Sequence, residues 1–540
     1  MLQVVWFKRD LRLFDHQPLV EAARSGEVLL MYVAEPSIWT HGDLSKRHLR
    51  FVNESLQQID LALQKKGVPF FTAVAEIEDV LESIFSQYGP FRLLAHEENG
   101  ATNTYARDRR VHRWMRERGL SFDEFQHFGV KRRLKNRDHF QRYWETFMNE
   151  AILPVPSTIT PVSNPPRSVL VQGIDFRALL GIVPGQFVQQ GQVGGEEQGE
   201  RIFQDFLTNR SRMYQSHLSF PFESMRSCGR ISPYLAWGNL SIRSVVHRTH
   251  EQIAQVDSRH RWHLQSFLSR LQWHCHFIQR IEDEPRLDSL TMNQAYEGIR
   301  SEDEQIMKAW LEGRTGFPIV DASMRCLQET GWLHFRGRAM VVSFICNTLM
   351  QDWRTPAKIL SQLFLDYEPG IHYSQIQMQA GTTGFNTIRI YNPTKHSIEH
   401  DPEGKFIRRF VPELADIPLE HLHEPWWWQD PVSFDYVRPM VDLAEANRVA
   451  RDALWNVRKL AESKEEAARL LEKHGSRRGS GRAFSSKRSS TNEGRTPGKT
   501  ASGKSASGKS ASGKTASTKN TASKKQLGAP EGFEQLRFDF

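Results

Sequence analysis

Cysteine is scarce in this sequence, and its four cysteines form no motif. Cys228, Cys275, Cys326 and Cys346 lie far apart and include no CxxC pair. Zinc and iron–sulfur centres need clustered thiolates, and small disulfide-built folds need many paired cysteines. We therefore expect reduced, packed thiols and no metal centre of these kinds.

Long apolar runs are also missing. No segment comes near the ~18 consecutive apolar residues that indicate a membrane-spanning helix. Met1 leads directly into the strand-like LQVVWF, without the basic and apolar regions of a secretory signal, so we expect a cytoplasmic protein. No GxGxxG motif follows a strand-like run, so the usual dinucleotide fingerprint is absent where it would act.

Positive charge is concentrated at one end of the chain. The net charge is +8, but residues 475–525 alone hold 13 lysines and arginines against one acid. The rest of the chain is close to neutral. A DNA-binding surface outside the basic segment therefore has to be a local patch.

The basic segment has no apolar face to bury. Residues 475–540 are rich in Ser, Gly, Lys and Ala and repeat the unit SASGK, which predicts a disordered tail. The repeat also matches the P-loop pattern. Because no strand precedes it and no helix follows, we expect no ATP site there.

Strand-like and helix-like segments alternate over residues 1–130. The runs VVWF, VLLMYVA, PFFTAV and RLLAHE have the composition of buried strands, and apolar residues at helical spacing occupy 45–65 and 77–88. This alternation predicts an α/β domain with a parallel, Rossmann-like sheet.

The amino-acid composition changes twice after the α/β domain. Residues 151–200 are rich first in proline and then in glycine and glutamine, which indicates a connector that runs over the surface, and we place the whole interdomain connector at 131–200. Residues 201–474 are mostly helical in pattern and rich in Trp, His and Arg. We therefore expect a second, all-α domain before the tail.

Four segments resemble one known family. VVWFKRDLRLFDHQPL (4–19) is similar to the opening of the photolyase/cryptochrome α/β domain. GRISPYLAWGNLSIR (229–243), TGFPIVDASMRCLQETGWLHFRGRAM (315–340) and the segment from RIYNP to FVPEL (389–414) are similar, in family order, to the three blocks of its FAD domain. The resemblance implies a blue-light flavoprotein that binds FAD and contacts DNA.

The resemblance also implies an antenna in the α/β domain. Family members normally carry a folate or a deazaflavin there. Asn103 matches one antenna contact, but Thr104 replaces the acid that usually follows it. Which second chromophore binds is left open.

The FAD pyrophosphate needs fixed donors. Arg230 and Ser232 open a predicted helix after Gly229, and an arginine, a hydroxyl and a helix N-terminus together make an anion site. The resemblance implies that Arg230, Ser232 and Tyr214 contact the FAD phosphates. Helix capping is a compatible use of Ser232.

The resemblance places an ion pair and two further groups beside the flavin ring. The pair is Arg338 with Asp366, the second acid is Glu368, and the residue facing flavin N5 is His372. A surface ion pair is the alternative for Asp366. His372 could donate a proton or respond to the flavin charge, because an unperturbed imidazole titrates near neutrality, and a packed histidine is the alternative.

The family's three-tryptophan electron-transfer route is incomplete. Only Trp353 stands at its expected place, whereas the other two positions are Ile376 and one close to Arg300. The aromatic residues that could replace the missing steps are Tyr373, Tyr367 and Trp332.

The family's lesion pocket is altered too. Trp273 keeps a stacking position, but Arg270 replaces a catalytic Glu, Phe335 replaces an Asn or His, and Met378 replaces a second stacking Trp. Arg336 and Arg389 match positions that approach DNA phosphates. The residues expected to carry the chemistry are Trp273, Arg270, His372 and Trp353.

Two functions of different classes follow, and both suit a monomer. The first is deoxyribodipyrimidine photo-lyase activity, a carbon–carbon lyase reaction in which reduced FAD repairs flipped-out pyrimidine lesions in single- or double-stranded DNA. The second is a sensory cryptochrome that has lost repair, which the substitutions at Arg270, Phe335 and Met378 favour. A flavin-bearing DNA-binding protein without photochemistry is a third reading.

The chain ends in Gln535-Leu536-Arg537-Phe538-Asp539-Phe540. Three large apolar residues have no reason to follow a polar tether unless something buries them. The spacing resembles peptides that dock on the bacterial sliding clamp, although Phe538 stands where Leu is usual. Docking back onto the protein itself, or no role at all, are the alternatives.

Overall fold

The computed structural model describes residues 1–167, 169–188, 190–428 and 435–476. The expected tail lies outside these ranges except for Gly475 and Ser476, and the peptide Gln535–Phe540 lies outside them completely. Within the described ranges, no helix is long and apolar enough to cross a membrane.

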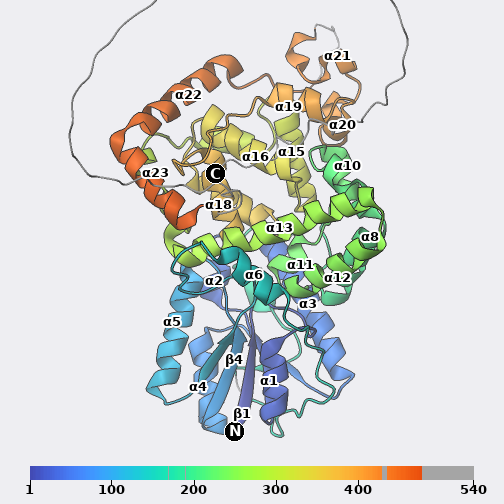
Figure 1. Cartoon of the computed structure of the whole chain (residues 1–540), viewed down its shortest axis with the longest axis vertical. Coiled ribbons are helices and arrows are strands. Elements are labelled where there is room, and N and C mark those ends of the chain that lie inside the picture. Colours follow the sequence, from blue (N-terminus) through green and yellow to red (C-terminus); the bar gives the residue numbers. More distant parts are fainter. Residues whose placement is uncertain (168, 189, 429–434, 477–540) are drawn as a thin grey trace, which may run out of the picture. The chain divides into compact units, whose positions relative to one another are not determined.

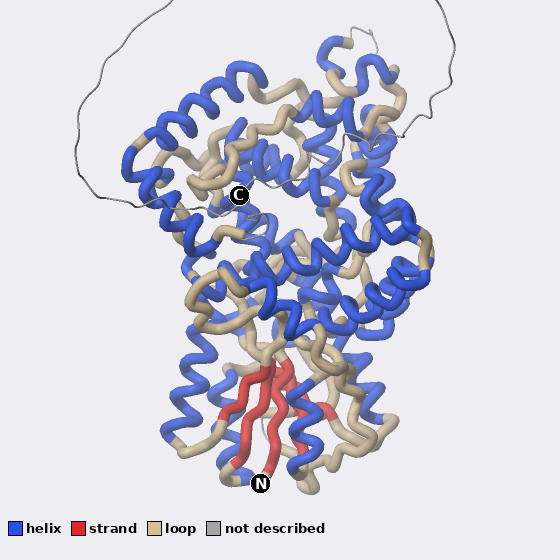
Figure 2. Tube along the Cα trace, viewed as in Figure 1, coloured by secondary structure: helices blue, strands red, loops and turns tan. Residues whose placement is uncertain are grey.

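A six-stranded sheet forms the core of the α/β domain (Figure 2). Its strands are β1 (Leu2–Phe7), β2 (Val28–Val33), β3 (Phe70–Ala73), β4 (Phe91–His96), β5 (Phe122–Phe125) and β6 (Val171–Gln172), in the order β5-β4-β1-β2-β3-β6. The strands β1 to β5 pair in parallel, whereas β6 pairs antiparallel with β3. The predicted α/β fold is confirmed, and two short strands, β5 and β6, add to the four expected ones.

Helices cover both faces of the sheet, as a parallel sheet requires. They are α1 (Gln17–Ser25), α2 (Pro36–Trp39), α3 (Lys46–Gln64), α4 (Ile77–Tyr88) and α5 (Thr102–Glu117). Alternate residues of β1 enter two separate cores. Val5 and Phe7 pack with α1 and α3, and Val4 and Trp6 pack with α4 and α5. The period of two along the strand is what divides them.

The connector at 131–200 is more structured than its composition indicates. It forms α6 (Phe140–Met148) and α7 (Arg177–Leu180) and contributes β6. Phe140, Trp144, Phe147 and Met148 of α6 are buried in the main core. α6 precedes residues 151–200, the stretch expected on the surface, and its amphipathic apolar face makes it part of the folded core.

The second domain is helical, as predicted (Figure 1). Its helices are α8 (Glu196–Thr208), α9 (Tyr214–His217), α10 (Pro221–Ser227), α11 (Ser232–Ala236), α12 (Ile242–Gln255), α13 (Ser258–Asp283), α14 (Glu304–Leu311), α15 (Pro318–Thr330), α16 (Phe335–Ser343), α17 (Arg354–Leu363), α18 (Pro369–Ala380), α19 (Pro393–His400), α20 (Lys405–Phe410), α21 (Leu419–Leu422), α22 (Leu443–Lys459) and α23 (Ala461–His474). A π-helical turn, Phe344–Thr348, continues α16. The helix α13 contacts α18 and α12 and runs along the sheet side of this domain (Figure 1).

The two domains meet through backbone at the end of β1. The Leu11 N–H donates to the Trp237 carbonyl at 3.1 Å. Gly238 has φ +71, and a Cβ there would lie 2.2 Å from the Arg9 carbonyl oxygen. Only glycine permits both this left-handed backbone and this approach. The chain after α11 is thereby held against the carboxyl end of the sheet.

Candidate functional site

Asp366 forms a two-hydrogen-bond ion pair with Arg338 in the helical domain. Its carboxylate accepts from both ends of the Arg338 guanidinium, at 3.0 and 2.8 Å. The Asp366 side chain is 5% exposed and that of Arg338 is 29% exposed. Burial raises the pKa of Asp366, but Arg338 and a hydrogen bond from Ser232 outweigh it, so the pKa lies below its ordinary value. The alternative of a surface ion pair does not hold for Asp366.

Arg230 stands close to this pair and has no ion-pair or hydrogen-bond partner for its guanidinium among the described residues. It lies over the Trp332 ring at 4.1 Å, and its backbone has φ 58. Burial lowers its pKa to about 10. A partly buried cation without an acid is costly. An anionic group such as a phosphate would supply the missing partner.

The helix after Arg230 contributes less than the sequence indicates. α11 spans only five residues, and its N-cap is Ile231 rather than Ser232. Ser232 instead hydrogen-bonds to Asp366. The expected capping role of Ser232 is therefore wrong, and a helix this short adds little dipole to an anion site. The geometry leaves Arg230 as the main cationic donor here.

His372 lies one turn into α18 and is a neutral imidazole. Its Nε2 donates to the Ala357 carbonyl at 2.8 Å, and burial lowers its pKa to about 4. The pKa of His372 does not lie near neutrality, because desolvation outweighs the attraction of Asp43 and Asp366, which favours the alternative of a packed histidine. The ring remains fixed by its hydrogen bond, with the uncharged form present at pH 7.

Glu368 is turned toward the α/β domain. It is 5% exposed and lines a small polar cavity together with Arg9, Asp10 and His96. Burial raises its pKa to about 7. Glu368 therefore differs from Asp366, two residues earlier, which is held as a carboxylate by Arg338.

Of the three positions of the tryptophan route, only Trp353 holds an aromatic residue. Trp353 is buried, and its Nε1 donates to Thr291 Oγ1 at 3.1 Å. Ile376 is buried in α18, and Arg300 donates its Nε to the Cys346 carbonyl at 2.6 Å. The structure therefore offers no aromatic group at the positions of Ile376 and Arg300.

Several residues expected at the lesion pocket come together from α9, α13 and α16. The Arg270 guanidinium lies 5.7 Å from the Phe335 ring centroid, and it hydrogen-bonds to Tyr214. Arg336 Nε donates to Ser219 Oγ at 2.6 Å. Trp273 lies one turn after Arg270 and stacks on Phe277 at 5.8 Å. Arg270, Trp273, Phe335 and Arg336 are all partly exposed.

Two other residues expected at the lesion pocket, Arg389 and Met378, differ from this group in their exposure. Arg389 is exposed, and its carbonyl accepts from Ser343. Met378, the replacement for a stacking Trp, is 8% exposed in α18. Met378 is therefore a mostly buried side chain, with little surface for a stacking contact.

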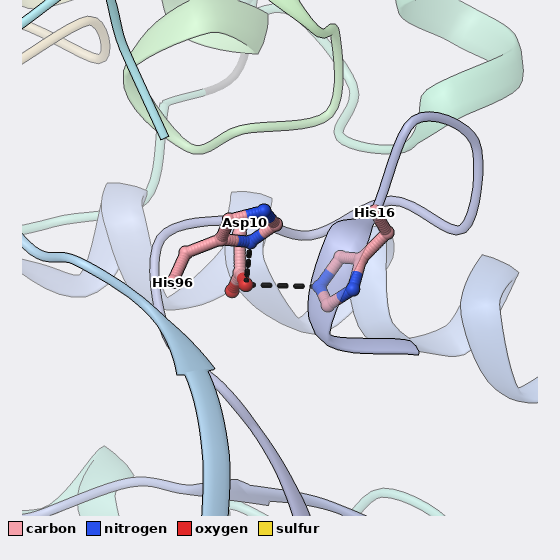
Figure 3. A group of neighbouring side chains, drawn as sticks. All are labelled: Asp10, His16 and His96. Carbon is pink, nitrogen blue, oxygen red and sulfur yellow. Dashed lines mark hydrogen bonds and ion pairs between the residues drawn. The ribbon is translucent and has the colours of Figure 1, made fainter. Parts of the chain in front are cut away.

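A buried triad stands where β1 and β4 end (Figure 3). Asp10 Oδ2 accepts from His16 Nε2 at 2.9 Å and from His96 Nδ1 at 2.7 Å. His16 Nδ1 accepts the Leu19 N–H at 3.1 Å, which fixes the proton on Nε2. The nitrogens that face Asp10 thus carry protons and have no lone pair for a cation. This triad is a hydrogen-bonded group that connects the chain segments at the ends of β1 and β4.

Comparison with known proteins matches both domains. The family model described as DNA photolyase matches residues 3–131, and the FAD binding domain of DNA photolyase matches residues 267–456. The deoxyribodipyrimidine photo-lyase of Escherichia coli (strain K12) is 29% identical over 460 residues, which span 82% of this chain and 96% of that protein. The chain belongs to the photolyase/cryptochrome family.

Other members of the family are similar to a comparable degree. Cryptochrome DASH of Synechocystis sp. (strain ATCC 27184 / PCC 6803 / Kazusa) is 26% identical, covering 83% of this chain and 95% of that protein. The solved bacterial class III photolyase from Agrobacterium tumefaciens has a TM-score of 0.75 at 24% identity, covering 85% of this chain and 98% of that one. The Synechocystis cryptochrome structure has a TM-score of 0.74 at 23% identity. These structures share the fold.

FAD is the cofactor of this family member. The donor set fits it, because Arg230 is a partly buried guanidinium that lacks an anion and lies close to Asp366. Arg338 and Ser232 hold Asp366, so part of the set expected around FAD comes together from α11, α16 and the segment before α18. Tyr214 instead bonds to Arg270, and Glu368 faces the α/β domain.

Some residues at the domain boundary escaped the sequence reasoning. Asp43 accepts hydrogen bonds from Tyr367 and Tyr373, and Arg9 donates to the Tyr367 and Ala236 carbonyls. More than 200 residues of sequence separate the two partners of each of these hydrogen bonds. No local pattern marks such contacts. The motif around Arg9 carries the family resemblance, but the motif does not predict that Arg9 contacts Tyr367.

Proposed function

We propose that this protein repairs UV-induced pyrimidine dimers in DNA by light-driven electron transfer from reduced FAD. FAD supplies the excited-state electron. The observation that carries the proposal is the partly exposed group of Arg270, Phe335, Trp273 and Arg336, which adjoins Tyr214 and the FAD residues. A cation beside an aromatic surface suits an extruded, damaged base with its phosphates.

In this proposal each side chain has a separate part. Trp273 stacks on the lesion, and Arg270 donates to its carbonyl oxygens in place of the Glu usual in the family. Arg336 and Arg389 hold the phosphates, a contact that positions DNA without reading its sequence. Arg230, Arg338 and Asp366 keep FAD in place. Together they would bring the lesion and FAD into one site.

A sensory cryptochrome without repair is the second candidate. The observation that favours it is the Arg270 side chain itself, which packs on Phe335 and hydrogen-bonds to Tyr214 and so has contacts of its own. Met378 is mostly buried as well. In this reading the altered pocket holds no lesion, and the protein reports light to a partner.

Light-dependent repair separates the two candidates. Chemically reduced, purified protein is mixed with an oligonucleotide that contains one cyclobutane dimer and is illuminated with blue light. We expect the intact pyrimidines to reappear in the light and not in the dark. An unchanged dimer in protein that carries full reduced FAD would contradict repair and favour the sensory candidate.

Arg270 and Arg336 should differ in what they bind. Arg270→Ala is expected to weaken binding of dimer-containing DNA about tenfold or more while leaving undamaged DNA nearly unchanged, because a charge-assisted hydrogen bond contributes ~1.5–3 kcal/mol. Arg336→Ala, as a phosphate contact, should weaken both DNAs equally. Titrations of labelled duplexes at one fixed salt concentration measure this. Equal losses in the Arg270 variant would remove it from the lesion pocket.

We also propose that an antenna chromophore binds in the α/β domain. Trp6, Trp39 and Trp237 line a cavity that also includes Asn103, Thr104 and several charged side chains. Aromatic walls with a few polar groups are typical of sites for planar ligands. We expect a second chromophore besides FAD in acid extracts of the purified protein, and less of it with Asn103→Leu. FAD as the sole chromophore in protein from a host that makes folates and deazaflavins would oppose this.

A further inference from the structure

Two tyrosines share one buried carboxylate at the boundary between the domains. Tyr367 Oη donates to Asp43 Oδ2 at 3.0 Å, and Tyr373 Oη donates to Asp43 Oδ1 at 3.1 Å. All three side chains are buried. Asp43 lies between α2 and α3 of the α/β domain, whereas the tyrosines belong to the helical domain. Only the tertiary fold brings them together.

Both tyrosine rings contact His372 with their edges. The ring centroids of Tyr367 and His372 lie 5.2 Å apart at 81°, and those of His372 and Tyr373 lie 5.2 Å apart at 86°. Tyr367 directly follows Asp366, which binds Arg338. The tyrosines therefore stand immediately behind the residues proposed to surround the flavin.

The nearby tryptophans are poorly placed to lose an electron. Three of them have a guanidinium over the ring: Arg230 over Trp332 at 4.1 Å, Arg9 over Trp237 at 4.4 Å and Arg354 over Trp353 at 5.1 Å. Oxidation turns a tryptophan ring into a cation, and a neighbouring cation opposes that charge. Arg354 is also paired with Asp352, so the effect is strongest at Trp332 and Trp237.

The tyrosine pair avoids this electrostatic cost. A tyrosine that loses an electron also gives up its phenolic proton and becomes a neutral radical. Asp43 lies within the ~2.6–3.2 Å over which a base accepts a proton directly. Burial raises the pKa of Asp43, but the nearby His41 and the hydrogen bonds from the two phenols outweigh it, so Asp43 is a carboxylate at pH 7. The proton thus has an acceptor in place.

His41 connects this carboxylate with solvent. Its Nδ1 lies 3.7 Å from Asp43 Oδ2, and its side chain is 44% exposed. Its interaction with the Asp43 carboxylate raises the pKa of His41 above its ordinary value. His41 therefore links Asp43 to solvent, because an exposed imidazole exchanges its own proton with water.

We infer that Tyr367 and Tyr373, with Asp43 as their base, form the electron donor that reduces photoexcited FAD in this protein. The pair takes the place of the aromatic residues missing at Ile376 and Arg300. The inference requires FAD beside His372, as proposed above, but it does not require DNA repair.

The electrons and protons of this step balance. One tyrosine gives one electron to photoexcited FAD and its phenolic proton to Asp43, which leaves a neutral tyrosyl radical. A thiol in solution then returns one electron and one proton to that radical. The O–H bond that was broken in the first step is thereby restored, and the thiol is the species that is oxidised overall.

The test is electron paramagnetic resonance on the full-length holoprotein, illuminated and frozen. We expect a radical signal that narrows when the protein is made with ring-deuterated tyrosine. Tyr367→Phe/Tyr373→Phe should lose this signal and slow FAD photoreduction in the presence of thiol about a hundredfold, since a positioned base contributes at least that much. Asp43→Asn, which preserves the shape of the network, should slow it similarly.

A matched control is Tyr143→Phe. Tyr143 lies on α6, and its hydroxyl is hydrogen-bonded to the Gln126 side chain. The Tyr143→Phe variant should leave the radical signal intact. A signal insensitive to tyrosine deuteration, or one lost in Trp353→Phe but kept in the double tyrosine variant, would overturn the inference. The labelled wild type answers the question even where a variant fails to fold.

The repair assay keeps the two proposals apart. Chemically reduced protein needs no electron from a tyrosine, so repair of the dimer under that condition tests the proposed function alone. The tyrosyl signal in dimer-free protein tests the donor pair alone. The outcome of the repair assay therefore does not depend on the outcome of the tyrosyl-radical measurement, and the reverse also holds.

Discussion

Asp366→Ala is expected to release FAD and to lower the free energy of unfolding by about 3 kcal/mol, the lower end of the range for breaking a buried ion pair. Asp366 is 5% exposed and binds Arg338 through two hydrogen bonds. Without it, the Arg338 guanidinium loses its acid beside the flavin site. The lower end applies because Arg338 itself is 29% exposed and keeps some water.

The measurement compares flavin absorbance per protein and denaturant unfolding of the apoprotein. Apoprotein is needed because loss of a bound ligand by itself reduces the observed stability. Glu413→Ala is a matched control, since Arg325 holds Glu413 by two hydrogen bonds of 2.9 and 2.7 Å, with side chains 23% and 22% exposed. We expect that control to cost ~1 kcal/mol or less and to retain FAD. Full yellow colour and unchanged stability in Asp366→Ala would refute the assignment.

Arg230→Met is expected to have opposite effects on stability and on FAD binding. Arg230 is a partly buried cation with a pKa lowered to about 10 by burial and with no acid or carbonyl partner among the described residues. Removing an uncompensated charge should stabilise the apoprotein. The same change should weaken FAD binding about 10- to 100-fold, because charged hydrogen bonds contribute ~1.5–3 kcal/mol and ~1.4 kcal/mol is tenfold.

Arg47→Met supplies the contrast. Burial also lowers the pKa of Arg47 to about 10, but its guanidinium donates to the Leu363 and Leu327 carbonyls at 2.7 and 3.3 Å. We expect Arg47→Met to destabilise the protein by ~1–3 kcal/mol, since it leaves carbonyls unpaired, and to leave FAD affinity unchanged. Titration of apoprotein with FAD and thermal unfolding measure both variants. A less stable Arg230→Met apoprotein with normal FAD affinity would place Arg230 in the scaffold.

Strand and helix positions in the α/β domain were readable from local pattern. The helix expected over 77–88 is α4 (Ile77–Tyr88), and the one expected over 45–65 is α3 (Lys46–Gln64). Both have apolar residues at helical spacing over several turns. The strands β5 and β6 were missed because β5 is only partly buried and β6 is two residues long. Such short segments carry too few residues for a period to show.

The pairing of Arg338 with Asp366 was also predictable, but only through the family resemblance. The charge state of each acid was not. Asp366 and Glu368 are two residues apart, yet the pKa of the first is lowered and that of the second is raised to about 7. Arg338 reaches Asp366 and does not pair with Glu368. The lowered pKa of His372 was not predictable either. Desolvation depends on which groups pack around a side chain, and the sequence does not show them.

The sequence by itself determined the family, the two-domain order, the FAD requirement and the residues of the expected ion pair. These depend on motifs and periodicity, which are local properties of the chain. Only the tertiary structure decided that Asp43 meets Tyr367 and Tyr373 and that Arg9 meets Tyr367, across more than 300 residues. It also decided that the Arg230 guanidinium has no hydrogen-bonded acid among the described residues, although Asp366 lies close by. Burial and long-range contact set these electrostatic properties, and neither has a local signature in a single sequence.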